Sequence, residues 1–182
     1  SNAETSPGVV AVLTGADLAT DGIGPLPCGW MIHSRDGSPM KQPPHPALSV
    51  GTVRYVGEPY AVVIGETRAA AQAGADLLDP DFEELPANVD TASAQSTAPI
   101  HEGIPNNLCY DWTLGDEAAT DAALASAVHV IELDIVNNRL IPNAIEPRAA
   151  IGEYDRGTGE HTLYTTSQNP HVIRLLMGAF CL

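Results

Sequence analysis

Short apolar runs alternate with Pro- and Gly-rich segments through the first half of the chain. Residues 9–13 follow a Pro-Gly turn and predict a buried strand, and residues 14–18 predict a helix cap with one helical turn. Residues 53–56 predict a second strand, which a turn separates from a third at residues 60–64. The third is apolar throughout, which predicts burial on both of its faces.

An alanine-rich stretch follows and predicts a helix from Arg68 to about Leu78, with Thr67 as its N-cap. Its small side chains would let this helix approach a sheet closely. Asp79-Pro80 predicts the end of the helix, because the residue before a proline is pushed out of the helical region. Residues 81–86 then predict an edge strand whose charged side chains point outward.

The second half of the chain begins with residues 91–107, which are rich in Ser, Thr, Ala, Pro and Asn and predict a linker over the surface. The pattern beyond them predicts a helix at 116–127, strands at 129–136, 149–154 and 162–166, a turn at 155–159, and a helix from Pro170. Strands and helices in this order indicate an α+β fold. The last apolar pattern continues to Leu182 without a cap, so we expect a piece of a longer protein that self-associates through this exposed helix.

A long segment at residues 22–46 contains six prolines and predicts an irregular loop. Loops of this length within compact domains are usually functional or mobile. Trp30, His33 and His45 lie in it and could approach a substrate channel or a partner subunit. Packing at the surface is the interpretation that we favour for these three side chains.

The net charge of −15 comes from 23 acidic and 8 basic residues. It argues against nucleic-acid binding, because neutralising phosphates requires clustered Lys and Arg. Ordinary solubility explains the acidic surface most simply, and steering of cations or of a basic partner is the alternative. No apolar run reaches the roughly 20 residues that a membrane span needs.

The three cysteines, Cys28, Cys109 and Cys181, form no Cys-x-x-Cys pair. This spacing argues against a zinc or iron–sulfur site and favours free thiols in a reducing cytoplasm. The six histidines show no metal-binding spacing, and Ser167 has no evident partner base for nucleophilic catalysis. The sequence also contains no phosphate-binding glycine loop and no Rossmann fingerprint.

Two phrases that lie far apart in the chain carry the most information about function. The first is Val53-Arg54-Tyr55-Val56-Gly57-Glu58-Pro59, and the second joins Ile145-Glu146-Pro147-Arg148 to Thr166-Ser167-Gln168-Asn169-Pro170-His171. Weaker phrases at residues 7–14, 81–87 and 138–140 follow the same order. Together they resemble the large, molybdenum-cofactor-binding subunit of the xanthine dehydrogenase family, in the branch typified by aerobic carbon monoxide dehydrogenase.

This resemblance implies a hammerhead-like α/β domain over residues 4–134, without its first strands, and the truncated opening of a molybdenum-cofactor-binding domain over residues 135–182. It implies a parent enzyme that hydroxylates an aldehyde, an N-heterocycle or a similar small molecule with oxygen from water. The parent's cofactor would be a molybdopterin-type molybdenum cofactor in its cytosine dinucleotide form. Its partners would be the remainder of the large subunit and iron–sulfur and flavin subunits or domains.

In that family, the glutamine that matches Gln168 hydrogen-bonds the apical oxo ligand of molybdenum. A neutral amide can donate to an oxo group without adding charge or coordinating the metal. Gln168 is therefore the one cofactor-binding residue that the resemblance assigns, and the simpler alternative is that it caps the backbone that follows. We expect Glu146 and Arg148 to form a local ion pair rather than to face the cofactor or a neighbouring domain.

Three features of the family have no match in this sequence: its glycine-rich cofactor phrase, its later active-site loop and its general-base glutamate. That base removes a proton from the metal-bound oxygen nucleophile before attack. The resemblance therefore predicts that the isolated chain has no complete catalytic site, binds no cofactor and is inactive. The alternative is a stand-alone binding or assembly module, which would hold the iron–sulfur subunit or the cofactor-insertion machinery through its acidic surface.

Overall fold

The computed structural model describes residues 2–138 and 140–180. The chain divides into two compact units, one of residues 1–113 with 176–182 and one of residues 114–175. Each unit mixes helices with a two-stranded antiparallel sheet. The mixed helix-and-strand character expected from the sequence is therefore confirmed.

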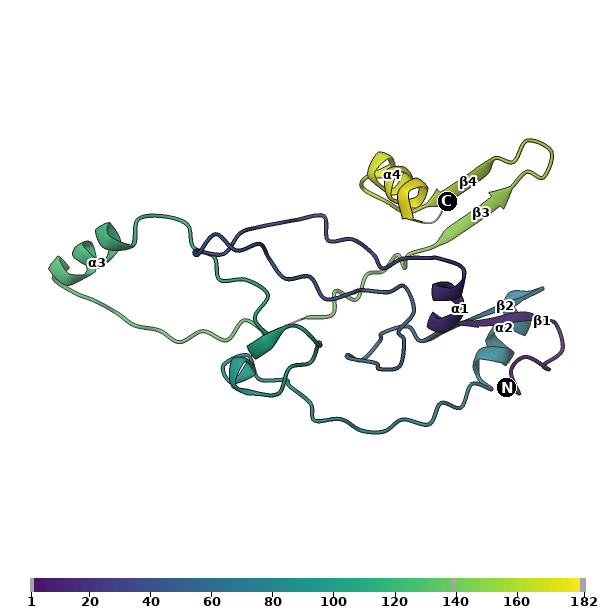
Figure 1. Ribbon diagram of the computed structural model, residues 1–182, viewed down its shortest axis with the longest axis horizontal. Helices are drawn as coiled ribbons and strands as arrows, with labels where there is room; N and C mark the ends of the chain where they lie inside the picture. Colours follow the sequence, from purple (N-terminus) through teal and green to yellow (C-terminus); the bar gives the residue numbers. More distant parts are fainter. Residues whose placement is uncertain (1, 139, 181–182) are drawn as a thin grey trace. The chain divides into compact units, whose positions relative to one another are not determined.

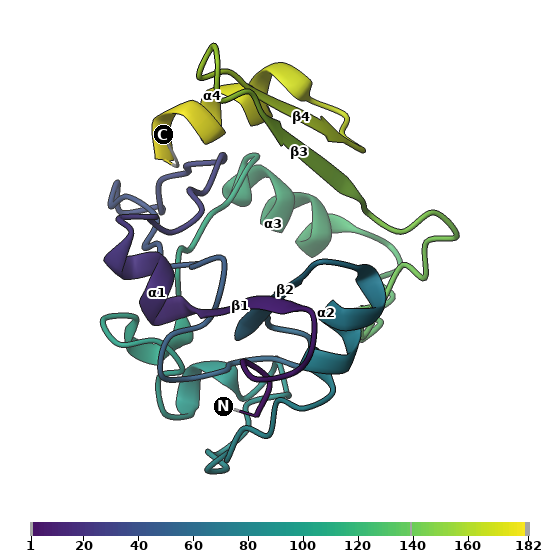
Figure 2. The ribbon, with the colours of Figure 1, turned by 90° about the vertical axis from the view of Figure 1, so that its right-hand side faces the viewer.

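The first unit is built on a sheet of β1 (Val9–Thr14) and β2 (Ala61–Gly65) (Figure 1). The strands pair antiparallel from Thr14 opposite Ala61 to Val9 opposite Gly65, and the register shifts between Val9 and Ala11. Helix α2 (Arg68–Ala75) lies beside this sheet, as Figure 2 shows. The predicted strand at 9–13 and the predicted helix after residue 67 are both present.

Helix α2 approaches the sheet closely because a glycine stands at the contact. A Cβ added to Gly74 would lie 2.7 Å from Cγ2 of Val9 and 2.9 Å from Cγ1 of Val63. The helix begins as predicted, because Oγ1 of Thr67 accepts a hydrogen bond from the Ala70 N–H at 3.1 Å. It ends three residues earlier than expected, and Leu77 and Leu78 form hydrogen-bonded turns beyond it.

Strand β2 is less buried than its apolar sequence predicts. Val63 faces α2, whereas the side chains of Val62 and Ile64 on the other face remain 42% and 43% exposed. The expectation of burial on both faces is therefore wrong for this structure. Only one face of the two-stranded sheet has a helix packed against it among the described residues.

Helix α1 (Gly15–Thr20) follows β1 directly and is joined to it by a capping box. The backbone N–H and the hydroxyl of Thr14 both donate to Oδ2 of Asp17 at 2.7 Å. Gly15 is buried at this junction, where an added Cβ would meet the carbonyl oxygens of Leu48 and Ser49. The start of α1 is thus held against the segment at residues 48–49.

Two short 3₁₀ turns, Ala94–Ser96 and Pro105–Asn107, order the segment that the composition predicts to be a linker. The side-chain amide of Asn107 donates to the carbonyl oxygens of Ala94 at 2.9 Å and Ala98 at 3.1 Å. Its Oδ1 accepts the N–H of Ile100 at 2.8 Å. This segment is a hydrogen-bonded loop, and Ile104 within it is buried.

The second unit contains helix α3 (Glu117–Ser126) and a hairpin of β3 (Ala150–Tyr154) and β4 (His161–Thr165). Asp116 caps α3 by accepting the Ala119 N–H at 2.9 Å, and the hairpin pairs from Ala150 opposite Thr165 to Tyr154 opposite His161. Helix α4 (Pro170–Phe180) begins at the predicted proline. These elements confirm the predicted helices at 116–127 and from Pro170 and the predicted strands at 149–154 and 162–166.

Three predicted strands, at residues 53–56, 81–86 and 129–136, are not strands in this structure. At the first, the Glu58 N–H donates to the Tyr55 carbonyl at 3.2 Å, and Gly57 has a φ of 92°, which together form a turn. The other two have no ladder partner among the described residues. A strand needs a neighbouring strand for its hydrogen bonds, so an apolar alternation alone does not produce one.

Candidate functional site

Gln168 lies in the loop between β4 and α4. Two hydrogen bonds of Asn169 fix the end of the loop that leads into α4. The Asn169 N–H donates to Oγ of Ser167 at 3.0 Å, and the Asn169 carbonyl accepts the Ile173 N–H at 3.1 Å. Residues 167 and 169 therefore supply the local hydrogen bonds that start α4. The interpretation of Gln168 as a backbone cap is not supported, since Asn169 and Ser167 make these bonds.

The side chain of Gln168 is exposed and makes no hydrogen bond to another described residue. Its amide therefore keeps both N–H donors and its carbonyl oxygen available. It also precedes the positive end of an 11-residue helix, which favours an electronegative group nearby. This donor chemistry fits an oxo group of the cofactor that the resemblance implies.

Glu146 and Arg148 do not form the ion pair expected of them. Both side chains are exposed, and neither has an ionic partner among the described residues. An ion pair between exposed side chains contributes little free energy, so nothing holds the two charges together here. In the phrase at residues 138–140, Arg139 lies outside the described residues, and Leu140 is exposed.

The proline-rich loop is attached to residues 109–111 by backbone hydrogen bonds. The Arg35 N–H donates to the Asp111 carbonyl at 2.8 Å, and the Lys41 N–H donates to the Cys109 carbonyl at 2.9 Å. Arg35 and Asp111 also form an ion pair at 3.4 Å. Trp30 is 77% exposed in this loop. The packing at the surface that we expected is therefore not observed for its side chain.

A second group of polar side chains, which the sequence does not reveal as a site, surrounds Arg54. Glu58 is a buried residue, 8% exposed, and its carboxylate accepts a hydrogen bond from the backbone N–H of Arg54. The guanidinium of Arg54 donates from one terminal nitrogen to the Thr52 carbonyl at 3.2 Å. Burial and the adjacent Arg54 cation lower the pKa of His101, and Glu58 opposes them.

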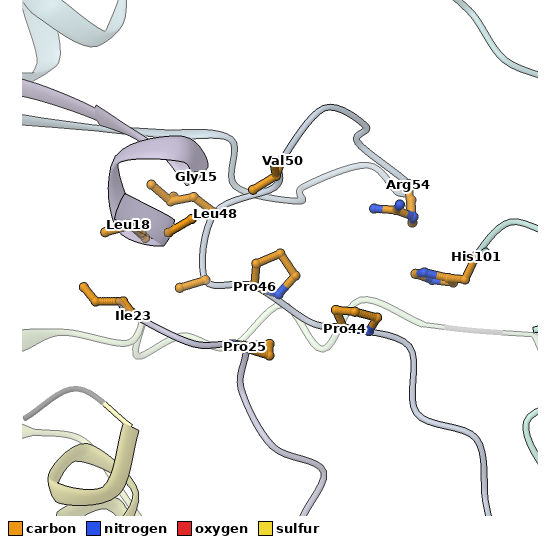
Figure 3. Close-up of a pocket in the computed structure, with 12 residues that line it drawn as sticks. Gly15, Leu18, Ile23, Pro25, Pro44, Pro46, Leu48, Val50, Arg54 and His101 are labelled. Atoms are coloured by element: carbon orange, nitrogen blue, oxygen red, sulfur yellow. The ribbon is translucent and has the colours of Figure 1, made fainter. Parts of the chain in front are cut away.

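Arg54 and His101 line the edge of a cavity of about 270 Å³. Figure 3 shows the side chains of Arg54 and His101 at one end of it, with Pro44 beside His101, and the aliphatic side chains of Leu18 and Ile23 at the other. Arg54 and Glu58 belong to a phrase that the sequence singles out, but His101 comes from the distant loop at residues 94–107. No sequence signal links that histidine to this phrase.

No three His, Cys, Asp or Glu side chains in the described part of the chain gather closely enough to hold a metal ion. No helix in residues 2–138 or 140–180 is long and apolar enough to cross a bilayer. Cys28 and Cys109 carry free thiols as predicted, and Cys181 lies outside the described residues.

Comparisons with known proteins give consistent results. Residues 100–181 match the molybdopterin cofactor-binding domain family. The chain is 30% identical to the carbon monoxide dehydrogenase large chain of Afipia carboxidovorans, over 98% of this chain and 22% of that one. It is 28% identical to the nicotine 6-hydroxylase large subunit of Paenarthrobacter nicotinovorans, over 99% of this chain and 21% of that one.

A solved structure agrees with these relatives. The fold is similar to that of quinoline 2-oxidoreductase from Pseudomonas putida 86, with a TM-score of 0.76 and 28% identity. The match covers 98% of this chain and 22% of that chain. The chain thus spans about a fifth of the length of each of these three proteins.

Proposed function

This chain belongs to the large, molybdenum-cofactor-binding subunits of the xanthine dehydrogenase and carbon monoxide dehydrogenase family, and from that premise we propose that it supplies one edge of the active site of a molybdenum hydroxylase. The observation that carries the proposal is the free amide of Gln168 at the start of α4, within the residues that match the molybdopterin cofactor-binding domain. The cofactor, when bound, supplies the oxidation–reduction chemistry. Gln168 would donate an amide N–H to an oxo group of that cofactor.

We also propose that the chain divides into two domains. Residues 4–134 form a hammerhead-like domain, and residues 135–182 open the cofactor-binding domain. The parent hydroxylates a small molecule such as an aldehyde or an N-heterocycle with oxygen from water. The relatives support this class, since their names include a nicotine hydroxylase and an aldehyde oxidoreductase.

The proposed cofactor is the cytosine dinucleotide form of the molybdopterin-type cofactor, and the proposed partners are iron–sulfur and flavin subunits. Relatives named as a large chain, a large subunit and a complex subunit support assembly with other chains. A cytoplasmic location accords with the free thiols of Cys28 and Cys109. The isolated chain is catalytically silent in this proposal, because the family's general-base and glycine-rich phrases have no match in its sequence.

Substitution of Gln168 in the parent enzyme tests the proposal. We expect Gln168→Ala to lower kcat by about 10- to 100-fold, because the hydrogen bond to the oxo group is lost. Gln95→Ala, in an exposed 3₁₀ turn of the other unit, should leave kcat unchanged. Unchanged kcat and molybdenum content in the Gln168 variant would overturn the role of Gln168.

The isolated chain offers a second test, which separates the proposal from the binding-module alternative. Mixed with cofactor, an electron acceptor and an aldehyde, the 182-residue chain should show no turnover. Clear turnover would contradict the proposed silence. Stable capture of the cofactor-insertion machinery by the isolated chain would instead favour the assembly module, which the many exposed apolar side chains also permit.

A further inference from the structure

The cavity beside α1 has an apolar interior. Its wall consists of side chains from α1 and from the proline-rich loop, among them Leu18, Ile23, Pro25, Pro46, Leu48 and Val50 (Figure 3). Its volume of about 270 Å³ is close to the lower end of ligand pockets, about 300–1,000 Å³. An apolar cavity of about 150 Å³ already holds benzene, so a six-membered ring fits the space.

One permanent cation stands at the edge of this apolar space. Arg54 is the single Lys or Arg among the described residues that line the cavity. Its guanidinium has five N–H donors, and one terminal nitrogen donates to the Thr52 carbonyl. Its Nε is buried and has no hydrogen-bond partner, so the guanidinium is only partly satisfied by the protein.

The neighbouring acid does not neutralise this cation through a direct ion pair. The Glu58 carboxylate accepts the backbone N–H of Arg54, and no ion pair joins its oxygens to the guanidinium in the described part of the chain. His101 stands beside the guanidinium with a lowered pKa, so its imidazole is neutral at pH 7 and adds a hydrogen-bonding group without a second charge. The edge of the cavity therefore keeps one cation with donors to spare.

We propose that this cavity binds an aromatic monocarboxylate of about the size of benzoate, with its ring against the prolines and leucines and its carboxylate on the Arg54 guanidinium. A guanidinium matches a carboxylate in geometry and charge, and a ring contributes apolar area without many rotatable bonds. This site goes beyond the proposed cofactor function and uses none of its residues.

Titration of the 182-residue chain with benzoate, followed by NMR of its histidine ring protons, tests the proposal. We expect saturable shifts of the His101 ring signals with a Kd on the order of 1 mM. Benzamide has the same ring without the charge and should bind at least about tenfold more weakly. Arg54→Gln should weaken benzoate binding by a similar factor, whereas Arg148→Gln, which removes an exposed arginine of the other unit, should not.

A cavity-filling variant keeps the test informative if Arg54→Gln fails to fold. Ala19→Phe leaves the guanidinium in place and puts a ring into the apolar wall, so it should abolish the benzoate shifts. Equal binding of benzoate and benzamide, or unchanged benzoate binding by either variant, would overturn the assignment. Absence of any shift in the natural chain at concentrations well above the expected Kd would do so as well.

Discussion

The Glu58 carboxylate accepts the backbone N–H of Arg54, four residues earlier in the chain. This bond closes the turn at residues 55–58, in which Gly57 has a φ of 92° and the Glu58 N–H donates to the Tyr55 carbonyl. The buried acid thus sets the path of the backbone and, through it, the position of the Arg54 side chain. A glutamate that the sequence places in a turn acts here as the acceptor that organises it.

Removal of this acceptor should destabilise the first unit. We expect Glu58→Ala to lower the free energy of unfolding by about 1–3 kcal/mol, because the Arg54 N–H loses its partner in a partly buried place. Urea denaturation followed by circular dichroism measures the change. Glu84→Ala removes an exposed acid from an irregular segment and is the matched control. Equal midpoints for the two variants would contradict the role of Glu58.

The capping box at the start of α1 predicts a pH dependence. The hydroxyl and the N–H of Thr14 both donate to the Asp17 carboxylate, and they lower its pKa below the ordinary value of 3.8. Because the folded pKa is the lower one, the contribution of Asp17 is fully present above about pH 4 and is lost as the pH falls through the folded pKa.

Asp17→Ala should therefore lower the Tm at pH 7, and the difference from the natural chain should shrink as the pH falls below the ordinary aspartate pKa. Scanning calorimetry over this pH range measures it. Asp21→Ala changes an exposed acid just beyond the helix, whose side chain makes no hydrogen bond to another described residue, and it should lower the Tm less. A Tm difference for Asp17→Ala that stays constant down to pH 2 would contradict the linkage.

The close approach of α2 to the sheet depends on Gly74. A methyl group there would meet Val9 and Val63 at less than 3 Å, so Gly74→Ala should destabilise the first unit by about 1–3 kcal/mol despite the better helix propensity of alanine. Gly178→Ala is the control, since a Cβ at this position of α4 meets nothing within 4 Å. It should be neutral or slightly stabilising. Chemical denaturation of both variants compares them directly.

The sequence predicts an element correctly where hydrogen bonds between nearby residues are enough to form it. Thr67 caps α2 through a bond that spans three residues, and Asp155 organises the β3–β4 turn by accepting the Gly157 N–H at 2.7 Å. Such bonds need only the residue type and its spacing, so the pattern predicts them. Pro170 at the start of α4 is predicted for the same reason.

The sequence does not predict contacts between distant parts of the chain. Residues 129–136 alternate like a strand, but a strand also needs a partner that the pattern does not name. His101 and Arg54 meet only because two loops converge, and neither loop has a periodic signal. The role of Gln168, in contrast, rests on a family resemblance, and it stays a prediction because the placement of this residue in a loop does not test the contact with a cofactor.

The segment at residues 128–136 should drive self-association of the isolated chain. Its apolar side chains are largely exposed, with Ile131 at 92% and Ile135 at 77%, and its backbone has no strand partner among the described residues. An unpaired apolar strand can add to a second chain through its free backbone groups. In helix α4, which the sequence suggests for this role, Leu175 is 69% exposed, and Val172 and Met177 are 49% and 42% exposed.

We expect the natural chain to sediment as concentration-dependent oligomers and the double variant Ile131→Lys, Ile135→Lys to shift strongly toward monomer, since two buried lysines would oppose pairing. Val89→Lys is the matched control, because Val89 is also 92% exposed but lies outside the segment. Leu175→Lys tests α4 in the same way, at a side chain that is 69% exposed. Sedimentation velocity distinguishes the outcomes: an effect of Leu175→Lys alone would place the contact on α4, and equal effects of all three would point to nonspecific hydrophobic association.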